Sequence, residues 1–444
     1  MSSNKYSGIE WVGKIPGGWE MGRVSHRFEL TLGKMVEPDA GFSSRAQYPY
    51  LCAANLKWQG IDVTIQKSMY FSNQERRHYE VHEGDLLITE GGSIGTSCIY
   101  RGELGPVCYM QNSVIRARGK NTALNRFLAY WLEFVCGSGY LDVLCNKATI
   151  AHYTKDKVGK TPFPLMRERE YEAIANAIDG ACVPINVTMM TLEDGISVLE
   201  RYRTSVIHEA VTKGLNPDAP MKLSGIDWLE AMPEKWCIRK LNHIVHSFAS
   251  GTSVRAASYP ALAGEKGVLS LSAVFGGTYN PNANKRIDDD ELSRASCPVT
   301  DNCLLVSRCN TSEWVGLPAY VETGNADLFL PDKLWRLDCG STTLNKFIWY
   351  ALRSKGARDY CSIMSVGASS SMQNISSEDL LNMYVALPTD KGEMSEIVSF
   401  LDSKLPAIDV VLETKRKQID VLKRRRQSLI YECVTGKRRV GKEI

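Results

Sequence analysis

The sequence lacks the features that mark several common classes of protein. Its thirteen cysteines are an odd number and contain no Cys-x-x-Cys pair, which favours neither a disulfide framework nor a zinc knuckle. No stretch approaches the roughly 18 consecutive apolar residues of a transmembrane helix, and the first six residues contain no apolar core of a signal peptide. The simplest interpretation is a reduced, cytoplasmic protein.

Catalytic signatures are also missing. The sequence has no Pro-Pro, which excludes the Asn/Asp-Pro-Pro-Tyr/Phe signature of amino-methyltransferases. Gly8 to Lys14 copies the spacing of a phosphate-binding loop, but Ile15 stands where a Ser or Thr must bind magnesium. The seven histidines have no metal-ligand spacing, and His208 is interpreted as a surface residue or a helix cap. We therefore expect no catalytic residues and no metal site.

Length, composition and charge limit the class of protein and its possible ligands. A chain of 444 residues with 44% apolar and 23% charged residues is typical of globular protein with more than one domain. The net charge is only +3, yet residues 411–444 hold eleven Lys and Arg against four acids, a local +7 that leaves 3 − 7 = −4 for the rest. This basic C-terminal region could bind a polyanion, and a solvated or acid-paired helix face is the alternative.

Several short motifs occur twice along the chain, in the same order. Ser7-Gly8-Ile9-Glu10-Trp11 returns as Ser224-Gly225-Ile226-Asp227-Trp228, and Trp19 returns as Trp236, 217 positions later. Leu124 to Phe127 returns as Leu344 to Phe347 at an offset of 220, and Arg203 to Ile207 as Arg426 to Ile430 at an offset of 223. Two copies with so long a period indicate a duplicated module, because solenoid repeats run at roughly 20–50 residues.

Each copy ends in an apolar stripe with alternating spacings of three and four residues, which predicts a coiled-coil helix. The first stripe runs from Ile174 to Ala210, and adding 223 gives the second, from Ile397 to Cys433, in the same register. Pro184 and Pro406 predict that each long helix begins there, after a shorter helix. We expect the two helices to pack on each other within one chain, with dimerisation as the alternative.

The remaining segments have the composition and spacing typical of β-strands. Short β-prone runs separated by Gly, Asn and Asp precede one predicted helix in each copy. The predicted strands are Tyr48 to Cys52, Ile61 to Ile65, Asp85 to Thr89, Ser97 to Tyr100, Ser113 to Arg118, Val268 to Leu271, Asn302 to Ser307, Trp314 to Val321 and Leu334 to Leu337, and the predicted helices are Thr122 to Val135 and Thr343 to Arg353. Each copy is thus a mixed α/β (α+β) globule. Residues 59–110 match their counterpart in the second copy poorly. The two copies therefore share a scaffold but carry different surfaces, which predicts two different ligands bound at a fixed separation.

The chain resembles the DNA specificity subunit of type I restriction-modification systems. The motifs are Ser7 to Glu20, their echo from Ser224 to Trp236, and the helix endings Glu209 to Leu215 and Glu432 to Lys437. The resemblance implies two target-recognition domains, residues 1–165 and 216–389, separated by antiparallel helical spacers, residues 166–215 and 390–444, in a pseudo-twofold arrangement. It also implies double-stranded DNA with a bipartite site, two methyltransferase subunits and restriction subunits as partners. S-adenosylmethionine, ATP and Mg are then expected on the partners, with no cofactor on this chain.

Under this resemblance, loops after equivalent strands are the candidate DNA-reading sites. Glu90 follows one strand and Arg308 follows its counterpart; Glu accepts from cytosine N4 and Arg donates to guanine, so the loops are expected to read different half-sites. The alternative is that both make local ion pairs or face solvent. The full candidate set is Thr89, Glu90, Gly91, Gly92, Ser93, Arg308, Asn310, Thr311 and Ser312, with Lys57, Gln59, Arg76, Arg77, Gln111, Asn112, Lys285 and Arg286 as weaker candidates, and Trp11, Trp19, Trp228 and Trp236 for partner docking.

Two other functions compete with this hypothesis. A two-headed protein-interaction scaffold on a coiled-coil spacer would show no salt-sensitive DNA binding. A stand-alone enzyme is disfavoured because no catalytic constellation is present.

Overall fold

The computed structural model describes residues 4–36, 46–105, 108–145, 151–226, 228–369 and 372–440. The chain forms two compact units: unit 1 comprises Met1–Leu192 and Lys417–Ile444, and unit 2 comprises Glu193–Arg416. The long helices α5 (Glu168–Lys213) and α9 (Lys391–Val434) each cross this division, so each helix contributes one part to each unit.

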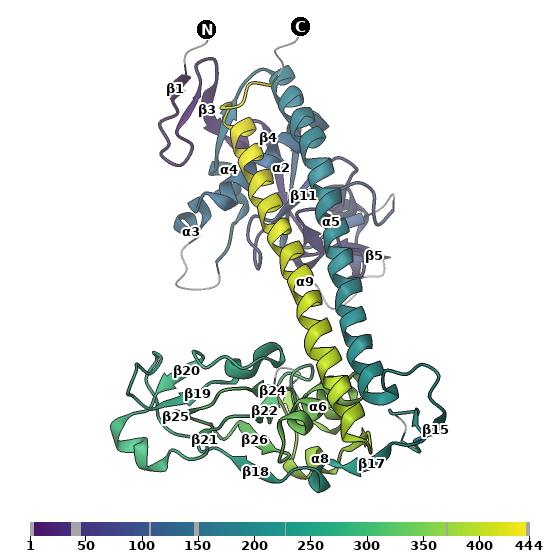
Figure 1. The fold of residues 1–444 in the computed structure, drawn as a ribbon. Helices are drawn as coiled ribbons and strands as arrows, with labels where there is room; N and C mark the ends of the chain where they lie inside the picture. The colour runs from purple at the N-terminus through teal and green to yellow at the C-terminus, as the bar shows by residue number, and fades with distance from the viewer. Residues whose placement is uncertain are drawn as a thin grey trace. The chain divides into compact units, whose positions relative to one another are not determined.

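Two four-stranded sheets form the frame of unit 1 (Figure 1). The first sheet has the order β11-β10-β13-β4 with antiparallel neighbours, and the second has the order β8-β5-β12-β9, in which β5 and β12 are parallel. The pairs β1-β2, β14-β3 and β6-β7 complete the strands. The elements are β1 (Asn4–Tyr6), β2 (Lys14–Pro16), β3 (Glu20–Arg23), β4 (Phe28–Leu32), β5 (Ala46–Leu51), β6 (Leu56–Lys57), β7 (Gly60–Ile61), β8 (Ser68–Phe71), α1 (Asn73–Tyr79), β9 (Glu80–Val81), β10 (Leu86–Thr89), β11 (Ser97–Ile99), β12 (Cys108–Met110), β13 (Val114–Gly119), α2 (Thr122–Gly137), α3 (Tyr140–Leu144), α4 (Lys155–Lys160) and β14 (Pro162–Leu165).

Unit 2 repeats the order of strands in both four-stranded sheets, although among the described strands the β6–β7 pair of unit 1 has no counterpart and unit 2 adds a three-stranded sheet, β23-β28-β27. Its two four-stranded sheets have the orders β24-β22-β26-β18 and β20-β19-β25-β21, again with one parallel pair, β19 and β25. Its elements are β15 (Met221–Leu223), β16 (Ala231–Pro233), β17 (Cys237–Lys240), β18 (Ser247–Ser250), β19 (Gly267–Leu269), β20 (Asn284–Arg286), β21 (Pro298–Val299), β22 (Cys303–Ser307), β23 (Cys309–Asn310), β24 (Pro318–Val321), β25 (Asn325–Phe329), β26 (Leu334–Asp338), α6 (Thr342–Arg353), α7 (Lys355–Met364), β27 (Val366–Ser369), β28 (Met372–Asn374), α8 (Ser377–Asn382) and β29 (Tyr384–Leu387). Residues 59–110 therefore keep the strand order of their counterpart although the sequence similarity is lost.

Equivalent polar anchors hold the same places in both units. Asn125 of α2 donates to the carbonyl of Gly84 (2.7 Å) and accepts from the N–H of Gly119 (2.7 Å). Asn345 of α6 likewise accepts from the N–H of Cys339 (2.7 Å) and donates to the carbonyl of Asn302. Because a buried amide without partners is costly, this position tolerates few other side chains.

An arginine, buried in unit 1 and half-buried in unit 2, joins the two sheets of each unit. Arg116 of β13 is 4% exposed and donates to the carbonyl of Glu80, where β9 begins. Arg336 of β26 donates to the carbonyl of Pro298 (2.7 Å), where β21 begins. The sheets are thus tied at the same point in both units.

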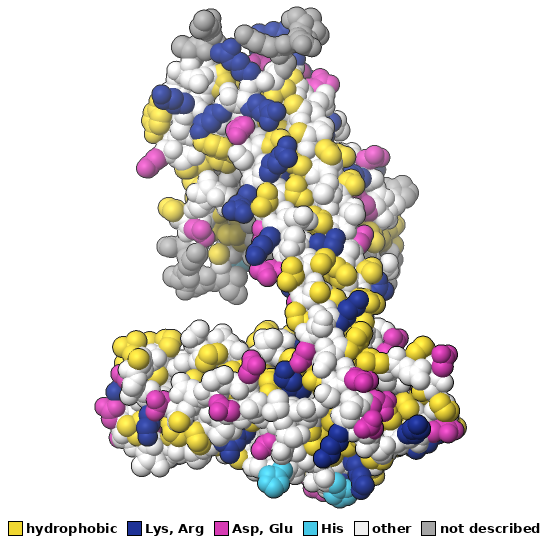
Figure 2. Space-filling view, viewed as in Figure 1, with side chains coloured by type: hydrophobic (Ala, Val, Ile, Leu, Met, Phe, Trp, Pro, Cys, Tyr) yellow, Lys and Arg dark blue, Asp and Glu magenta, His cyan; other side chains and the backbone are white. Residues whose placement is uncertain are grey.

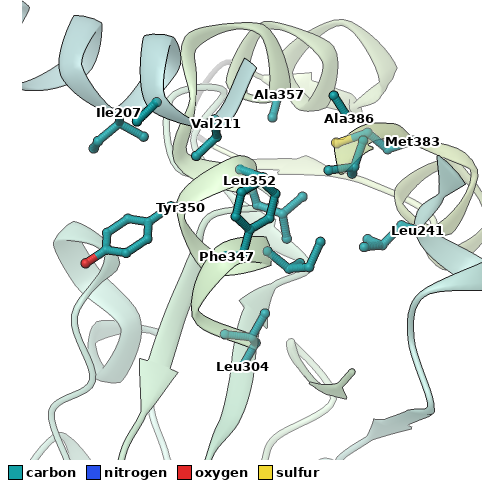
Figure 3. Close-up of a cluster of buried hydrophobic side chains, with 14 of the residues drawn as sticks. Ile207, Val211, Leu241, Leu304, Phe347, Tyr350, Leu352, Ala357, Met383 and Ala386 are labelled. Atoms are coloured by element: carbon teal, nitrogen blue, oxygen red, sulfur yellow. The ribbon is translucent and has the colours of Figure 1, made fainter. Parts of the chain in front are cut away.

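Each unit buries its own apolar core against the long helices. In unit 1, Phe127 and Trp131 of α2 are fully buried in one cluster with Ile178 of α5 and Val434 of α9. The corresponding cluster of unit 2 contains Phe347 and Leu352 of α6 with Ile207 and Val211 of α5 (Figure 3). α2 and α6 start with side-chain caps, since Asn121 and Ser341 accept from the N–H groups of Leu124 and Leu344.

The predicted helix stripes are confirmed, but their predicted starting points are wrong. All 22 stripe positions, eleven on each helix, are buried or half-buried, and within each unit α5 and α9 lie side by side (Figure 1). Each helix is continuous through its proline, Pro184 or Pro406, rather than beginning there. A proline removes one helical hydrogen bond, yet buried neighbours on both sides, Cys182 and Ile185 in α5, keep the helix packed.

By length and composition, α5 is the one described helix that could cross a membrane. An 18-residue window of this helix has a mean hydropathy of 1.2, and 33% of the window is buried; core helices of other proteins pass the same test.

The strand predicted for Ile61 to Ile65 is wrong beyond Ile61. The side-chain amide of Asn55 donates to the carbonyls of Asp62 (2.9 Å) and Ile65 (2.8 Å), so a side chain rather than a strand ladder satisfies this segment.

Candidate functional site

Three loops of unit 1 meet at one edge of the two sheets, after β4, β10 and β12. The N–H of Asn112 donates to the carbonyl of Lys34 (2.8 Å), and the N–H of Glu90 donates to the carbonyl of Ser113 (2.9 Å). The N–H of Gln111 donates to the carbonyl of Leu51. We call Lys34, Glu90, Gln111, Asn112 and Ser113 loop edge 1. It brings together three of the predicted residues: Glu90, Gln111 and Asn112.

Unit 2 builds the same edge from different side chains. The N–H of Thr252 donates to the carbonyl of Leu330 (3.2 Å), and the N–H of Arg308 donates to the carbonyl of Lys333 (3.0 Å). The first bond corresponds in unit 1 to the one from the N–H of Lys34 to the carbonyl of Met110 (2.9 Å). We call Thr252, Arg308, Pro331, Asp332 and Lys333 loop edge 2. The sequence reasoning did not select Asp332 and Lys333, although the offset of 220 that matches α2 with α6 also matches them with Asn112 and Ser113.

A glycine allows the backbones to meet at each edge. A Cβ on Gly33 would lie 2.2 Å from the carbonyl oxygen of Gln111, and a Cβ on Gly251 would lie 1.8 Å from that of Leu330. Neither distance is possible for real atoms, so only glycine permits this approach. The turn that carries Gln111 and Asn112 is therefore positioned directly by the end of β4.

Within the loop after β10, side chains divide into structural and accessible ones. Thr89 is buried and its hydroxyl donates to the carbonyl of Ser93 (2.5 Å), so it shapes the loop. Glu90 is half-buried, and burial raises the pKa of its carboxyl, with the nearby His152 opposing the shift. Gly91 lies against the His152 ring, whereas Gly92, at φ +71°, faces open space. Glu90 and Ser93 remain the side chains able to meet a ligand.

The corresponding loop of unit 2 is braced by α7 and β28. A Cβ on Gly316 would lie 2.6 Å from the sulfur of Cys361, and Asn310 pairs in a ladder with Gln373. The Asn310 side chain accepts from the N–H of Thr311 (2.9 Å), and Ser312 is exposed.

Apart from Gln111 and Asn112, which belong to loop edge 1, the weaker candidates lie away from the loop edges or are already engaged. Arg76 donates to the Tyr48 hydroxyl (2.6 Å), and Arg286 pairs with Glu265 (3.0 Å) and Asp289 (2.7 Å). The remaining ones, Lys57, Gln59, Arg77 and Lys285, are exposed on the β6–β7 hairpin, α1 and β20.

The four tryptophans tie the N-terminal segment of each unit to its helices. Trp19 donates to Glu170 (3.3 Å) and Trp236 donates to Glu393 (2.9 Å), and both indoles are nearly fully buried. Trp11 packs among Trp131, Phe134 and Tyr140, and Trp228 packs over Gly356. Trp19 and Trp236 can thus position a docking surface but offer little surface of their own.

The outer faces of the helices carry exposed apolar and basic side chains. Val183, Val187 and Met190 of α5 are each more than half exposed. In unit 1 a groove of about 540 Å³ lies between α5 and α9, and its lining includes the apolar Pro184, Ile185, Leu422 and Leu429 and the basic Arg425 and Arg438. Figure 2 shows Lys and Arg side chains scattered along this part of α9. An exposed apolar surface with a basic rim is typical of a protein-binding site.

Among the residues that the structure describes, no group of three or more His, Cys, Asp or Glu could hold a metal ion. Burial raises the pKa of the Cys98, Cys108 and Cys136 thiols to about 12, which keeps them protonated and unreactive.

Comparisons with known proteins agree with the sequence motifs. No family model matches the chain. The chain is 23% identical over 446 residues to the putative type I restriction enzyme MjaX specificity subunit of Methanocaldococcus jannaschii, covering 97% of this chain and 96% of that protein. It is 25% identical over 206 residues to the type I restriction enzyme EcoEI specificity subunit of Escherichia coli, where the match spans 46% of this chain and about a third (34%) of the relative.

A solved structure shares the fold. A chain from a study of complex assembly and conformational transition in the type I R-M system aligns with 96% of this chain and 100% of its own length, at a TM-score of 0.62 and 16% identity. This structure confirms the fold, and the relatives that align over nearly the whole chain confirm the resemblance drawn from the repeated motifs.

Proposed function

We infer that the chain is a DNA specificity subunit of a type I restriction-modification system, with one recognition domain in each unit. The observation that carries this inference is the repeated frame: both units have the same strand order and the same buried anchors, but different side chains at equivalent loop edges. Two similar readers with different surfaces suit a bipartite site whose halves differ in sequence. The names of the relatives, which align with this chain over nearly its full length, support the same conclusion.

The loop edges are the proposed readers of the two half-sites. At equivalent positions Glu90 accepts hydrogen bonds, as from cytosine N4, whereas Arg308 donates to guanine O6 and N7. Asn112 can bond adenine through both its amide atoms, while Asp332 at the equivalent position only accepts. Exposed lysines and arginines such as Arg77 would neutralise phosphates without reading sequence.

The chain itself acts without catalysis in this proposal. Residues 1–165 and 216–389 form the recognition domains, and residues 166–215 and 390–444 form the spacers. Two methyltransferase subunits, which methylate adenine N6 with S-adenosylmethionine, dock on the outer helix faces and the Trp11 and Trp228 segments. Restriction subunits use ATP and Mg. The assembly works in the cytoplasm.

The test combines stoichiometry with methylation. Mass measurement of the chain mixed with its methyltransferase subunit should show two partner copies per chain; one copy or none contradicts the duplicated docking surface. Sequencing the methylated adenines in a host that expresses the complex should reveal a split consensus. Absence of salt-sensitive DNA binding would favour a protein-interaction scaffold instead.

A further inference from the structure

A cavity of about 490 Å³ in unit 2 collects three arginines. Arg203 of α5, Arg353 at the end of α6 and Arg358 of α7 line it, together with apolar Ile207 and Leu317. Arg203 is paired with Asp409 (2.8 Å), and Arg358 donates to the carbonyls of Glu313 (3.1 Å) and Val315. One nitrogen of Arg358, Nη1, is buried without a hydrogen-bond partner.

Arg353 is the unusual member of this group. It is only 8% exposed and its guanidinium lies 4.5 Å from the ring centre of Trp349. No described residue accepts a hydrogen bond from it or lies within ion-pair distance. Burial and the nearby Arg203 lower the pKa of Arg353 to about 10, against the opposing effects of Tyr350 and Asp409, so it remains charged at neutral pH. A buried charge that has no hydrogen-bonded acceptor destabilises the structure that contains it.

The duplication shows which chemical group belongs beside these arginines. By the offsets of the two copies, Arg203 corresponds to Arg426 (203 + 223) and Arg353 to Glu133 (353 − 220). In unit 1 the Arg426 guanidinium is bound by both oxygens of the Glu133 carboxylate, one at 3.0 Å, and both side chains are 16% exposed. Unit 2 keeps the arginine but has a second arginine where the carboxylate stood.

We propose that the cavity beside Arg353 receives one carboxylate side chain from a partner protein, namely the methyltransferase subunit that docks on unit 2. This rests on the proposed function. The partner carboxylate takes the role that Glu133 has in unit 1, and docking on unit 2 depends on it whereas docking on unit 1 does not. Two copies of one partner are thus bound by chemically different contacts.

The surroundings favour a single carboxylate over a DNA phosphate backbone. Glu313 and Asp359 line the cavity with the three arginines, and Asp409 already pairs with Arg203. A row of phosphates would meet these acids, whereas a single carboxylate can bond to Arg353 alone. Trp314 also lines the cavity, stacked on Phe275 (ring centres 4.6 Å apart), which is 56% exposed. Aromatic side chains beside a buried arginine are typical of the residues that dominate protein–protein affinity.

Charge reversal at Arg353 tests the proposal in the full-length chain. Arg353→Glu replaces the cation that has no acceptor by a carboxylate that can share Arg203 with Asp409, so the melting temperature of the free chain should stay unchanged or rise. The second methyltransferase copy should then bind about tenfold more weakly or worse, while the first copy is unaffected. Arg353→Met should show the same split, and Glu133→Gln, the matched change in unit 1, should lower the melting temperature without selectively weakening the second copy.

The outcomes separate this proposal from its premise. If the wild-type chain binds no methyltransferase, the proposed function itself fails. If the wild type binds two copies and both Arg353 variants bind them with unchanged affinity, the carboxylate site is wrong, and a fall in melting temperature with unchanged binding would make Arg353 merely structural.

Two further measurements identify the source of the anion. Reversing the responsible acid of the partner to Lys or Arg should restore binding to Arg353→Glu. Submillimolar inorganic phosphate that stabilised the wild type but not Arg353→Met, or weaker DNA binding by free Arg353→Glu chain, would assign the cavity to a phosphate and overturn the proposal.

Discussion

Replacing Gly33 by alanine should weaken recognition of one half-site and leave the other intact. The added Cβ would lie 2.2 Å from the Gln111 carbonyl oxygen and 2.7 Å from that of Met110. Because contacts below 3.0 Å are essentially never seen, the turn must move by at least 3.0 − 2.2 = 0.8 Å. The obstacle is backbone, so no side-chain rotation relieves it. Overpacking of this kind costs about 1–3 kcal/mol, and a displaced base contact loses a similar amount of discrimination.

The assay compares DNA affinity for the intact bipartite site with affinity for sites altered in one half. Gly33→Ala should reduce discrimination at the half-site read by unit 1 about 5- to 100-fold, with the half read by unit 2 unchanged. Gly251→Ala should do the reverse. Gly18→Ala is the matched control, since nothing lies within 4 Å of its Cβ position. Equal behaviour of Gly33→Ala and Gly18→Ala, in folded protein, would refute the assignment of loop edge 1 to base reading.

Three other outcomes are expected. Exchanging residues from about Arg23 to Phe163 for the matching domain of a related subunit should change one half of the methylated consensus, and a change in both halves would show that the domains do not read independently. Adding four residues between Leu199 and Arg203 adds about 5.4 Å of helix and should lengthen the unread spacer by one or two base pairs; an unchanged spacer in an active mutant would show that the helices do not set it. Although burial opposes it, the hydrogen bonds of Glu75 with Lys34 and Ser72 lower its pKa to about 2, below its ordinary value of 4.5. This stabilisation, about 2–3 kcal/mol, is complete above about pH 5 and lost as the pH falls toward 2, so Glu75→Gln should flatten acid unfolding there.

The periodic parts of the fold could be predicted from the sequence because burial imposes a regular spacing. The stripes of α5 and α9, the helices α2 and α6 and the strands β10, β13 and β22 all follow from where apolar residues recur. The helix starts predicted at Pro184 and Pro406 are wrong, because the packing on both sides outweighs one lost hydrogen bond. The strand predicted after Ile61 is wrong because the Asn55 side chain, rather than a neighbouring strand, satisfies the carbonyls of this segment.

The candidate site could be predicted only in part. Glu90 and Arg308 follow recognisable strands, so the sequence located them. Asp332 and Lys333 reach loop edge 2 through pairing of β19 with β25, a contact between segments about 60 residues apart that no local pattern encodes (267 to 328). The repeat offset was the only usable signal, and it weakens where the two copies diverge.

The same arrangement explains how such a chain can change its target without losing its fold. The frame is fixed by groups that face inward: the asparagines Asn125 and Asn345, the arginines Arg116 and Arg336, and the Trp–Glu pairs at Glu170 and Glu393. Their loss would leave buried polar groups unpaired, at a cost of about 1–3 kcal/mol each. The loop edges are held by backbone hydrogen bonds and a glycine, so their outward side chains can be exchanged at little cost to stability. Arg308 and Asp332 stand where Glu90 and Asn112 stand in the other unit, on the same backbone. Divergence of recognition is thus confined to positions that the fold does not need.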